Sequence, residues 1–223
     1  MTFSIVARCA ATGQFGMAIS SSSPAVAARC AHVRAGVGVV ASQNITDPEL
    51  GQLTLDAMAT GLTAEQAVAT VLENRLYTEY RQLLAVDMHG NVAIHSGQNV
   101  LGTWSEAKGI DCAAAGNLLA NSEIASVMIT SFEQTKGQLA DRLLAALEAA
   151  AHAGGEAGPV HSAGLKVANK LSWPYVDLRS DWSDTPIEDL RTAWEVYKPQ
   201  ASAYVQRAMN PVQAPSYGVA GDL

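Results

Sequence analysis

Apolar and polar side chains alternate along the first residues of the chain, which is the pattern of a strand with one buried face. Phe3, Ile5 and Ala7 fall on one face of residues 3–8, and residues 15–21 form a second segment with strand character. The Thr12-Gly13 sequence between them is typical of a tight turn. The chain therefore begins with a predicted antiparallel hairpin.

Similar patterns predict the other elements. Further strands are expected at 37–42, at 83–87 and 92–95 around a His89-Gly90-Asn91 turn, at 110–115 before a Gly116-Asn117 turn, and at 162–168 and 175–179. Helices are expected at 48–59, at 63–73, from 121–123 to Gly137, at 139–151 and at 187–197, the first four with capping or stop residues. The glycine-rich residues 154–159 are predicted to form a flexible loop.

The order of these elements indicates the fold class. Runs of strands are followed by runs of helices without regular alternation, which favours antiparallel α+β layers over a parallel sheet. Residues 1–198 form the predicted domain, and its length is sufficient to bury a core without disulfides. Residues 199–223 form a tail that contains Tyr204, Val205, Met209 and Tyr217. Because such side chains are costly to expose, we expect the tail to dock on the core or on a partner subunit of a homo-oligomer.

Composition and charge exclude several classes of protein. Hydrophobic residues make up 48% of the chain and charged residues 16%, with no low-complexity tract, which excludes a disordered chain. The 14 basic residues are scattered among 21 acidic ones, so no concentrated cationic face is expected for nucleic acid. No apolar run approaches the roughly 20 residues of a membrane-spanning helix. We therefore expect a cytoplasmic protein that acts on a small-molecule substrate.

The cysteine and histidine patterns predict neither a disulfide framework nor a metal site. Cys9, Cys30 and Cys112 are odd in number, have no C-x-x-C spacing and lie among Ala and Val residues, which fits core positions in a reduced compartment. No pair of His, Asp or Glu residues has a convincing metal-ligand spacing, and no glycine-rich segment has the nucleotide-binding pattern. No metal and no cofactor are expected.

Thr2 stands at the start of the first predicted strand and is the first candidate for chemistry. Removal of the initiator Met would leave a threonine with a free α-amine. The hydroxyl group is a weak nucleophile until a base takes its proton, and an α-amine with a pKa of about 7.7–8.0 suits that task. Nucleophile and base would then belong to one residue, although many chains begin with Met-Thr for no catalytic reason.

Five sequence blocks add a family resemblance. They are T-F-S-I-V-A-R, A-T-G-Q-F-G-M-A-I-S, R-A-G-V-G-V-V-A-S-Q, A-G-N-L-L-A and Y-V-D-L-R. Together they resemble the bacterial DUF1028 family over about residues 2–198. That family is grouped with the N-terminal-nucleophile hydrolases, so the resemblance implies a four-layer αββα sandwich of two antiparallel sheets.

The resemblance also implies where a site would form, since the strand ends of that superfamily converge on the first residue. The implied catalytic residues are Thr2, Asn117 and His161, with a backbone N–H near Gln43 or the Asn117 amide as the oxyanion donor and His161 as a proton relay. The implied substrate-binding residues are Arg8, Ser20, Ser21, Arg34, Ser42, Gln43, Asn44 and Ser162. An alternative for Gln43 and Asn117 is that their amides only satisfy helix ends and loop backbone groups.

The chain departs from the family pattern beside the nucleophile. Cys9 stands where the family usually has Asp, and no lysine precedes Lys108, so the lysine helper of proteasome-like members is missing. Only Arg8, Arg29 or Arg34 could supply positive charge near the N-terminus, and arginine cannot act as a base at neutral pH. The α-amine of Thr2 must then be the base.

Three functions follow from this reading. The leading hypothesis is a hydrolase of a small amide, in which Thr2 attacks the carbonyl carbon and water then clears the acyl-enzyme. The second is a catalytically inert member of the same fold that binds a metabolite. The third is a structural or assembly subunit.

Overall fold

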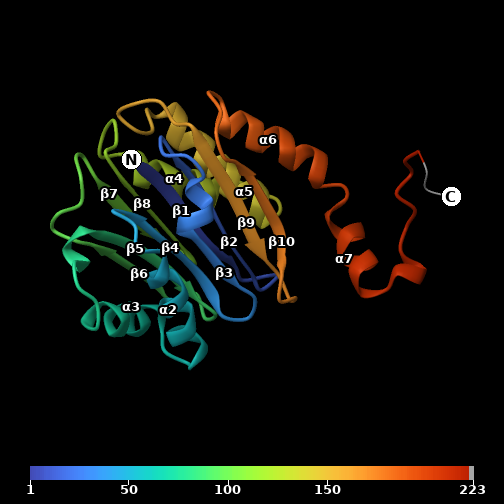
Figure 1. Cartoon of the computed structure of the whole chain (residues 1–223), viewed down its shortest axis with the longest axis horizontal. Coiled ribbons are helices and arrows are strands. Elements are labelled where there is room, and N and C mark those ends of the chain that lie inside the picture. The colour runs from blue at the N-terminus through green and yellow to red at the C-terminus, as the bar shows by residue number, and fades with distance from the viewer. Residues whose placement is uncertain (221–223) are drawn as a thin grey trace.

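The computed structural model describes residues 1–220, and its strands form two antiparallel sheets that pack face to face (Figure 1). Among these residues the larger sheet has six strands in the order β10-β9-β2-β1-β8-β7. They are β1 (Thr2–Cys9), β2 (Gln14–Ser21), β7 (Ser105–Gly109), β8 (Cys112–Asn117), β9 (Ser162–Ala168) and β10 (Pro174–Ser180). The predicted N-terminal hairpin is confirmed, because β1 pairs antiparallel with β2.

The smaller sheet covers one face of the larger one. It is formed by β3 (Ala31–Arg34), β4 (Gly38–Asn44), β5 (Arg81–Asp87) and β6 (Val92–Ser96), in that order. Every second side chain of β1 and β4 points into the space between the sheets. Val6 and Val39 belong to one buried cluster there. Ser4 and Gln43 lie on the same faces, nearer the start of β1 and the end of β4, and are hydrogen bonded to each other. This alternation decides which polar residues lie between the sheets.

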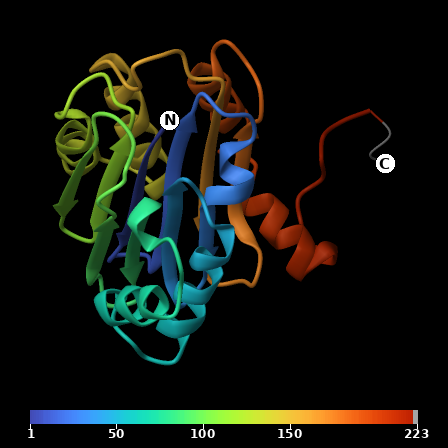
Figure 2. The same ribbon diagram turned by 60° about the vertical axis from the view of Figure 1, so that its left-hand side comes forward.

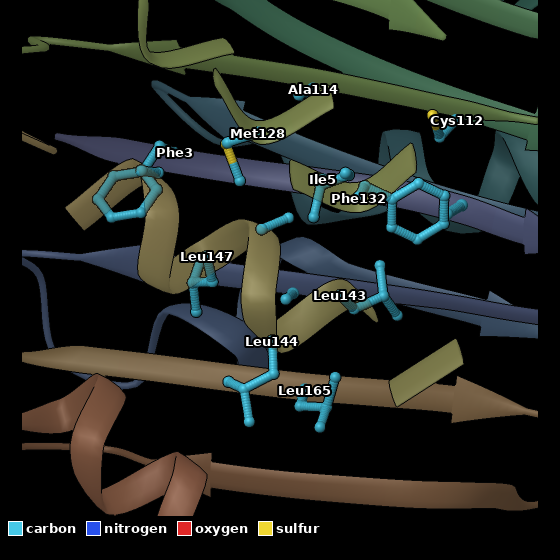
Figure 3. Packing of buried hydrophobic residues seen from close by; sticks show 14 of the residues in the cluster. Phe3, Ile5, Cys112, Ala114, Met128, Phe132, Leu143, Leu144, Leu147 and Leu165 are labelled. Carbon is cyan, nitrogen blue, oxygen red and sulfur yellow. The ribbon is translucent and has the colours of Figure 1, made fainter. Parts of the chain in front are cut away.

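Helices cover both outer faces and complete the four-layer αββα arrangement, which confirms the predicted α+β sandwich. The larger sheet is covered by α4 (Ile124–Gln134), α5 (Leu139–His152) and α6 (Pro186–Tyr197), and the smaller one by α2 (Pro48–Ala59) and α3 (Ala64–Glu73). Figure 3 shows Phe3 and Ile5 of β1 in the cluster with Phe132 of α4 and Leu143 of α5. None of the helices within residues 1–220 is long and apolar enough to cross a membrane.

Local capping explains where these helices begin. The Asp47 carboxylate accepts a hydrogen bond from the backbone N–H of Glu49, and Pro48 occupies the first turn of α2. Thr63 and Gln66 form a reciprocal capping box at the start of α3. Both helix starts agree with the sequence prediction, since they depend on residues close together in the chain.

Some short elements and several boundaries differ from the prediction. The helix α1 (Val26–Cys30) and the strands β3 and β7 were not predicted, because none is long enough, or regular enough in its apolar spacing, to show a period. The strand predicted at 110–115 is β8, which begins at Cys112 because Asp111 is in the left-handed region with a φ of 59°. Gly116 and Asn117 belong to this strand and not to a turn. Asn117 is therefore held rigidly by the sheet.

The segment after Pro199 leads away from the sandwich as an arm (Figures 1 and 2). It contains α7 (Ala201–Met209) and a 3-10 turn (Pro211–Gln213), and it is joined to the body by buried Ala201 and by Tyr204, which stacks on Tyr197 with ring centroids 5.6 Å apart. Further out, the Arg207 guanidinium lies 3.7 Å from the ring centroid of Tyr217. Residues 221–223 of the predicted tail lie outside the described residues.

Candidate active site

A row of four polar side chains crosses the larger sheet at the start of β1. Thr2 lies opposite Ser21 of β2 and Asn117 of β8, and Ser21 lies opposite Ser162 of β9. Residues directly opposite each other project from the same face of a sheet. That face looks toward the smaller sheet, because Ser4, two residues after Thr2, donates a 2.6 Å hydrogen bond to Gln43 Oε1 of β4. The four side chains therefore lie at the end of the space between the sheets.

The Thr2 hydroxyl lies against the peptide group that precedes it. Thr2 Oγ1 is within hydrogen-bonding distance of the Met1 carbonyl oxygen and is 3.4 Å from Ser21 Oγ. Ser21 Oγ also donates to the Met1 carbonyl oxygen, and it accepts a 3.0 Å hydrogen bond from the backbone N–H of Ser23. Thr2 is 6% exposed. Two hydroxyl groups thus converge on one carbonyl oxygen in a site that Met1 closes off from water.

Buried side-chain amides form the floor of this site. Gln43 Nε2 donates to Gln82 Oε1 over 2.8 Å, and Asn117 Nδ2 donates to the same oxygen over 3.2 Å. Gln82 Nε2 in turn donates to Ser96 Oγ over 3.1 Å. These bonds direct both predicted amides to Gln82, which was not predicted, and not toward the Met1 carbonyl. Because the partners of a buried network restrict one another, Asn117 is fixed beside Thr2.

Ser162 supports the row from its other end. Its Oγ donates to the carbonyl oxygen of Ser23 over 2.6 Å and accepts from the backbone N–H of Val26 over 3.1 Å. These two bonds hold the segment that connects Ser21 to α1. Ser162 thereby orders the backbone whose N–H at Ser23 holds the Ser21 hydroxyl.

Glu156 is a buried carboxyl group above this row. Its backbone forms a bridge with Leu119, just after β8, and each of its carboxylate oxygens lies 3.2 Å from the backbone N–H of Ser22, just after β2. Since β1 lies between β2 and β8 in the sheet, Glu156 connects the ends of the two strands that flank β1. Glu156 is 4% exposed.

Burial raises the pKa of the Glu156 carboxyl group to about 7, while the nearby α-ammonium of Met1 and the Ser22 N–H act in the opposite direction. The sequence analysis did not find this residue, because the loop at 154–159 was read as flexible from its glycines. The structure ties that loop to residues 118–120 through backbone hydrogen bonds of 2.9 and 3.0 Å. A single acidic residue in an otherwise glycine- and alanine-rich loop was the signal available.

The raised pKa of Glu156 predicts a pH-dependent loss of stability. Between its usual pKa near 4.5 and the folded value of about 7, the folded protein binds more protons than the unfolded chain. The contribution of this group is therefore complete at low pH and is lost as the pH rises through about 7. In protein that retains Met1, the quantity to follow is the free energy of unfolding of the wild type minus that of Glu156→Gln. We expect this difference to fall by about 2–3 kcal/mol between pH 5 and pH 8. Urea unfolding at several pH values measures this difference, and a constant difference would contradict it.

His161 does not reach the row, contrary to prediction. Its Nδ1 lies 3.2 Å from the carbonyl oxygen of Ser183, and its ring stacks on Trp182 with centroids 4.5 Å apart. Only its backbone approaches the site, since its N–H donates to the Ser21 carbonyl oxygen over 2.8 Å. Neighbouring residues in an extended chain point to opposite sides, so His161 turns away because Ser162 turns inward.

Arg8 and Arg34 lie at the opposite end of the sheets from Thr2. Arg8 is six residues further along β1, about 20 Å away by strand geometry, and forms a 2.8 Å ion pair with Asp111. Arg34 pairs with Gly38, at the end of β4 remote from Gln43, and forms a 2.8 Å ion pair with Asp56. Their predicted role in substrate binding at Thr2 is therefore wrong. For Arg8 the length of β1 alone excludes that role, because six residues of extended chain separate it from Thr2.

Three other predicted residues lie near the row but face away from it. Ser20 lies opposite Phe3, on the helix-covered face, and donates to the Ser162 carbonyl oxygen over 3.0 Å. Ser42 donates to the carbonyl oxygen of Asp47 over 2.8 Å, and Asn44 Oδ1 accepts from the backbone N–H of Leu101 over 3.3 Å. These side chains order the loops around the site. Within the described residues, no group of three His, Cys, Asp or Glu side chains is arranged to hold a metal ion.

The chain is similar to one known family over most of its length. A family model described as "Family of unknown function (DUF1028)" matches residues 2–190. A crystal structure of a protein from Silicibacter pomeroyi, assigned to the same family model, is 29% identical, superimposes with a TM-score of 0.86, and covers 92% of this chain and 90% of that chain. Anbu (ancestral beta-subunit) from Yersinia bercovieri is 12% identical with a TM-score of 0.39, over 92% of this chain and 97% of that chain. No curated protein matches the chain.

Proposed function

This chain belongs to the DUF1028 family, whose function is unknown, and from its site we propose that it is an amide hydrolase of the N-terminal-nucleophile type that uses Thr2 after removal of Met1. One observation carries the proposal. The hydroxyl groups of Thr2 and Ser21 both reach the carbonyl oxygen of the residue before Thr2. These contacts support the proposal, because acyl transfer needs a nucleophile beside a carbonyl group and a hydrogen-bond donor on its oxygen.

The reaction begins with transfer of the Thr2 hydroxyl proton to the free α-amine of the same residue. Thr2 Oγ1 forms a bond to the amide carbonyl carbon of the substrate, and the carbonyl electrons move to its oxygen. When the C–N bond breaks, the departing nitrogen takes the proton from the α-ammonium group. Water then attacks the ester carbon and gives a proton to the α-amine, and the C–O bond breaks as Thr2 Oγ1 takes that proton back. Amine and carboxylic acid are the products, and no oxidant or reductant is needed.

Ser21 stabilises the developing oxyanion in this scheme. The Ser21 hydroxyl already donates to a carbonyl oxygen at this position. The Ser23 N–H donates to the oxygen of this hydroxyl, so the proton of Ser21 is free for its own donation. A donor aimed in advance at an oxyanion is typically worth about 10²–10³ in rate. Asn117 and Ser162 act on the backbone and side chains around this pair and do not touch the reacting atoms.

Exposure of the Thr2 α-amine tests the proposal. A chain with an N-terminal tag, cut so that Thr2 becomes the first residue, is assayed before and after cleavage on a panel of small p-nitroanilides. We expect turnover only after cleavage, because both the base and access to the hydroxyl depend on it. The matched control is a second fusion whose cleavage leaves Met1 in place.

Equal rates before and after cleavage would contradict an N-terminal nucleophile. Absence of turnover in every state would favour the two alternatives, an inert metabolite-binding protein or an assembly subunit. The cysteines of the described chain are free, which fits our placement of this activity in the cytoplasm.

We also propose that the arm formed by residues 199–220 docks on a second copy of this chain. Met209, Val212 and Tyr217 are 61%, 93% and 55% exposed, which is costly for apolar side chains that gather on one projecting segment. Truncation after Pro199 is expected to reduce the molar mass in light scattering from a dimer or larger oligomer to the monomer. An unchanged oligomer with unchanged thermal stability would show that the arm holds no subunits together.

A further inference from the structure

Glu156 has fewer hydrogen-bond donors than a buried carboxylate requires. An ionised carboxylate can accept about four hydrogen bonds, whereas among residues 1–220 this one is served by Ser22 alone, through a backbone N–H shared between its two oxygens and through the Ser22 side chain. Its 4% exposure leaves little room for bulk water to supply the rest. A carboxylate in this state is unfavourable unless a cation comes to it. Within residues 1–220 this buried carboxyl group forms hydrogen bonds with Ser22 and no ion pair.

Met1 shows what reaches this position. Its carbonyl oxygen is held by the Thr2 and Ser21 hydroxyls, and the positive charge of its α-ammonium group acts on the Glu156 carboxyl group. Its side chain extends along the same loop, since Met1 Cε lies 3.6 Å from the position of a Cβ atom built on Gly158. The residue thus reaches from the nucleophile to the neighbourhood of the buried carboxylate.

An acyl group on the nucleophile would occupy the same space. The nitrogen and Oγ1 of Thr2 are separated by two carbon atoms, so acyl groups on either atom are related through a five-membered ring. If the carbonyl oxygen of an acyl group on Thr2 Oγ1 accepts from Ser21, the α-carbon of that acyl group lies where the α-carbon of Met1 lies. Removal of Met1 empties this space for the acyl part of a substrate. The α-substituents of that acyl part then face Glu156.

We propose that Glu156 binds the α-ammonium group of the substrate, so that the substrates are amides whose acyl part is a free α-amino acid. This inference rests on the proposed hydrolase function and names its substrate class. The alternative cation is the α-amine of Thr2 itself. The structure favours the substrate, because the positive charge that acts on this carboxyl group is on the Met1 nitrogen, one residue beyond Thr2, and the Ser22 N–H that holds the carboxylate follows Ser21, the donor to the Met1 carbonyl oxygen.

Two probes that differ in one group test the inference. Chain lacking Met1 is assayed with L-methionine p-nitroanilide and with its N-acetyl derivative. We expect kcat/KM to be at least about 100-fold higher for the free amine, because a site built around a buried charge discriminates strongly against a ligand that leaves it unpaired. Glu156→Gln should lower kcat/KM about 100-fold for the free-amine substrate and less than about threefold for the acetylated one.

The controls separate recognition from folding. Glu73→Gln, an exposed position at the end of α3 on the far side of the smaller sheet, should change neither rate. Glu156→Asp, which keeps the charge, should retain part of the preference if Glu156→Gln proves unstable in a thermal melt. An equal loss of kcat/KM on both substrates in Glu156→Gln, together with a shifted pH profile, would overturn the inference. Glu156 would then act on the α-amine of Thr2.

Binding distinguishes failure of this inference from failure of the hydrolase proposal. Calorimetry on Thr2→Ala lacking Met1, with methioninamide and N-acetylmethioninamide, needs no turnover. Tighter binding of methioninamide than of its N-acetyl derivative, lost when Glu156→Gln is added to Thr2→Ala, supports the site even if no amide is hydrolysed. Hydrolysis of both p-nitroanilides at equal rates, or binding of neither amide, would overturn it.

Discussion

Thr2→Ala, in chain lacking Met1, is expected to lower the kcat for amide hydrolysis by about 10⁴-fold. The substitution removes the only atom that forms a covalent bond to the substrate in the proposed mechanism. Thr2 makes no contact in the apolar clusters through its hydroxyl, whose neighbours are Met1 and Ser21. The thermal midpoint should therefore remain within a few degrees of the wild type, and single-turnover kinetics measure the loss.

Two further variants give this result its meaning. Thr2→Ser keeps a hydroxyl and an α-amine and should retain activity within about 10-fold of the wild type. Thr12→Ala changes a threonine in the exposed turn between β1 and β2 and should have no effect. Unchanged turnover in Thr2→Ala would transfer the chemistry to a cysteine or to an activated water molecule.

Ser21→Ala is expected to lower kcat by about 10²-fold with little change in KM. The lost hydroxyl donates to the carbonyl oxygen at the position where negative charge develops, so its contribution is greatest in the transition state. Ser23→Ala is the matched control, because Ser23 holds the Ser21 hydroxyl through its backbone N–H, which the substitution keeps. Steady-state kinetics on the same p-nitroanilide measure both variants. An equal loss in kcat for the control, or a rise in KM alone for Ser21→Ala, would argue against an oxyanion role.

The sequence predicted the parts of the fold that depend on neighbouring residues. The hairpin of β1 and β2 follows from alternation and a short turn, and the starts of α2 and α3 follow from Asp47 and Thr63. Elements without a repeated period, such as β7 with its sequence SEAKG, carry no comparable local signal. Their positions are decided by pairing with distant strands.

The site was predictable only in part, because side-chain direction changes with each residue of a strand. Ser21 and Ser162 lie in the row with Thr2, whereas their neighbours Ser20 and His161 point elsewhere. A difference of one residue in register decides between these outcomes. Glu156 could not be placed at all from local pattern, since it meets Ser22 from 134 residues further along the chain.

Covalent trapping tests directly whether Thr2 is the nucleophile. Chain lacking Met1 is treated with a small β-lactone derived from an α-amino acid, digested, and mapped by tandem mass spectrometry. We expect one acyl group on the N-terminal peptide, assigned to Thr2, and its absence in Thr2→Ala. Modification at Cys9, Cys30 or Cys112 with Thr2 untouched, in protein that hydrolyses amides, would contradict it.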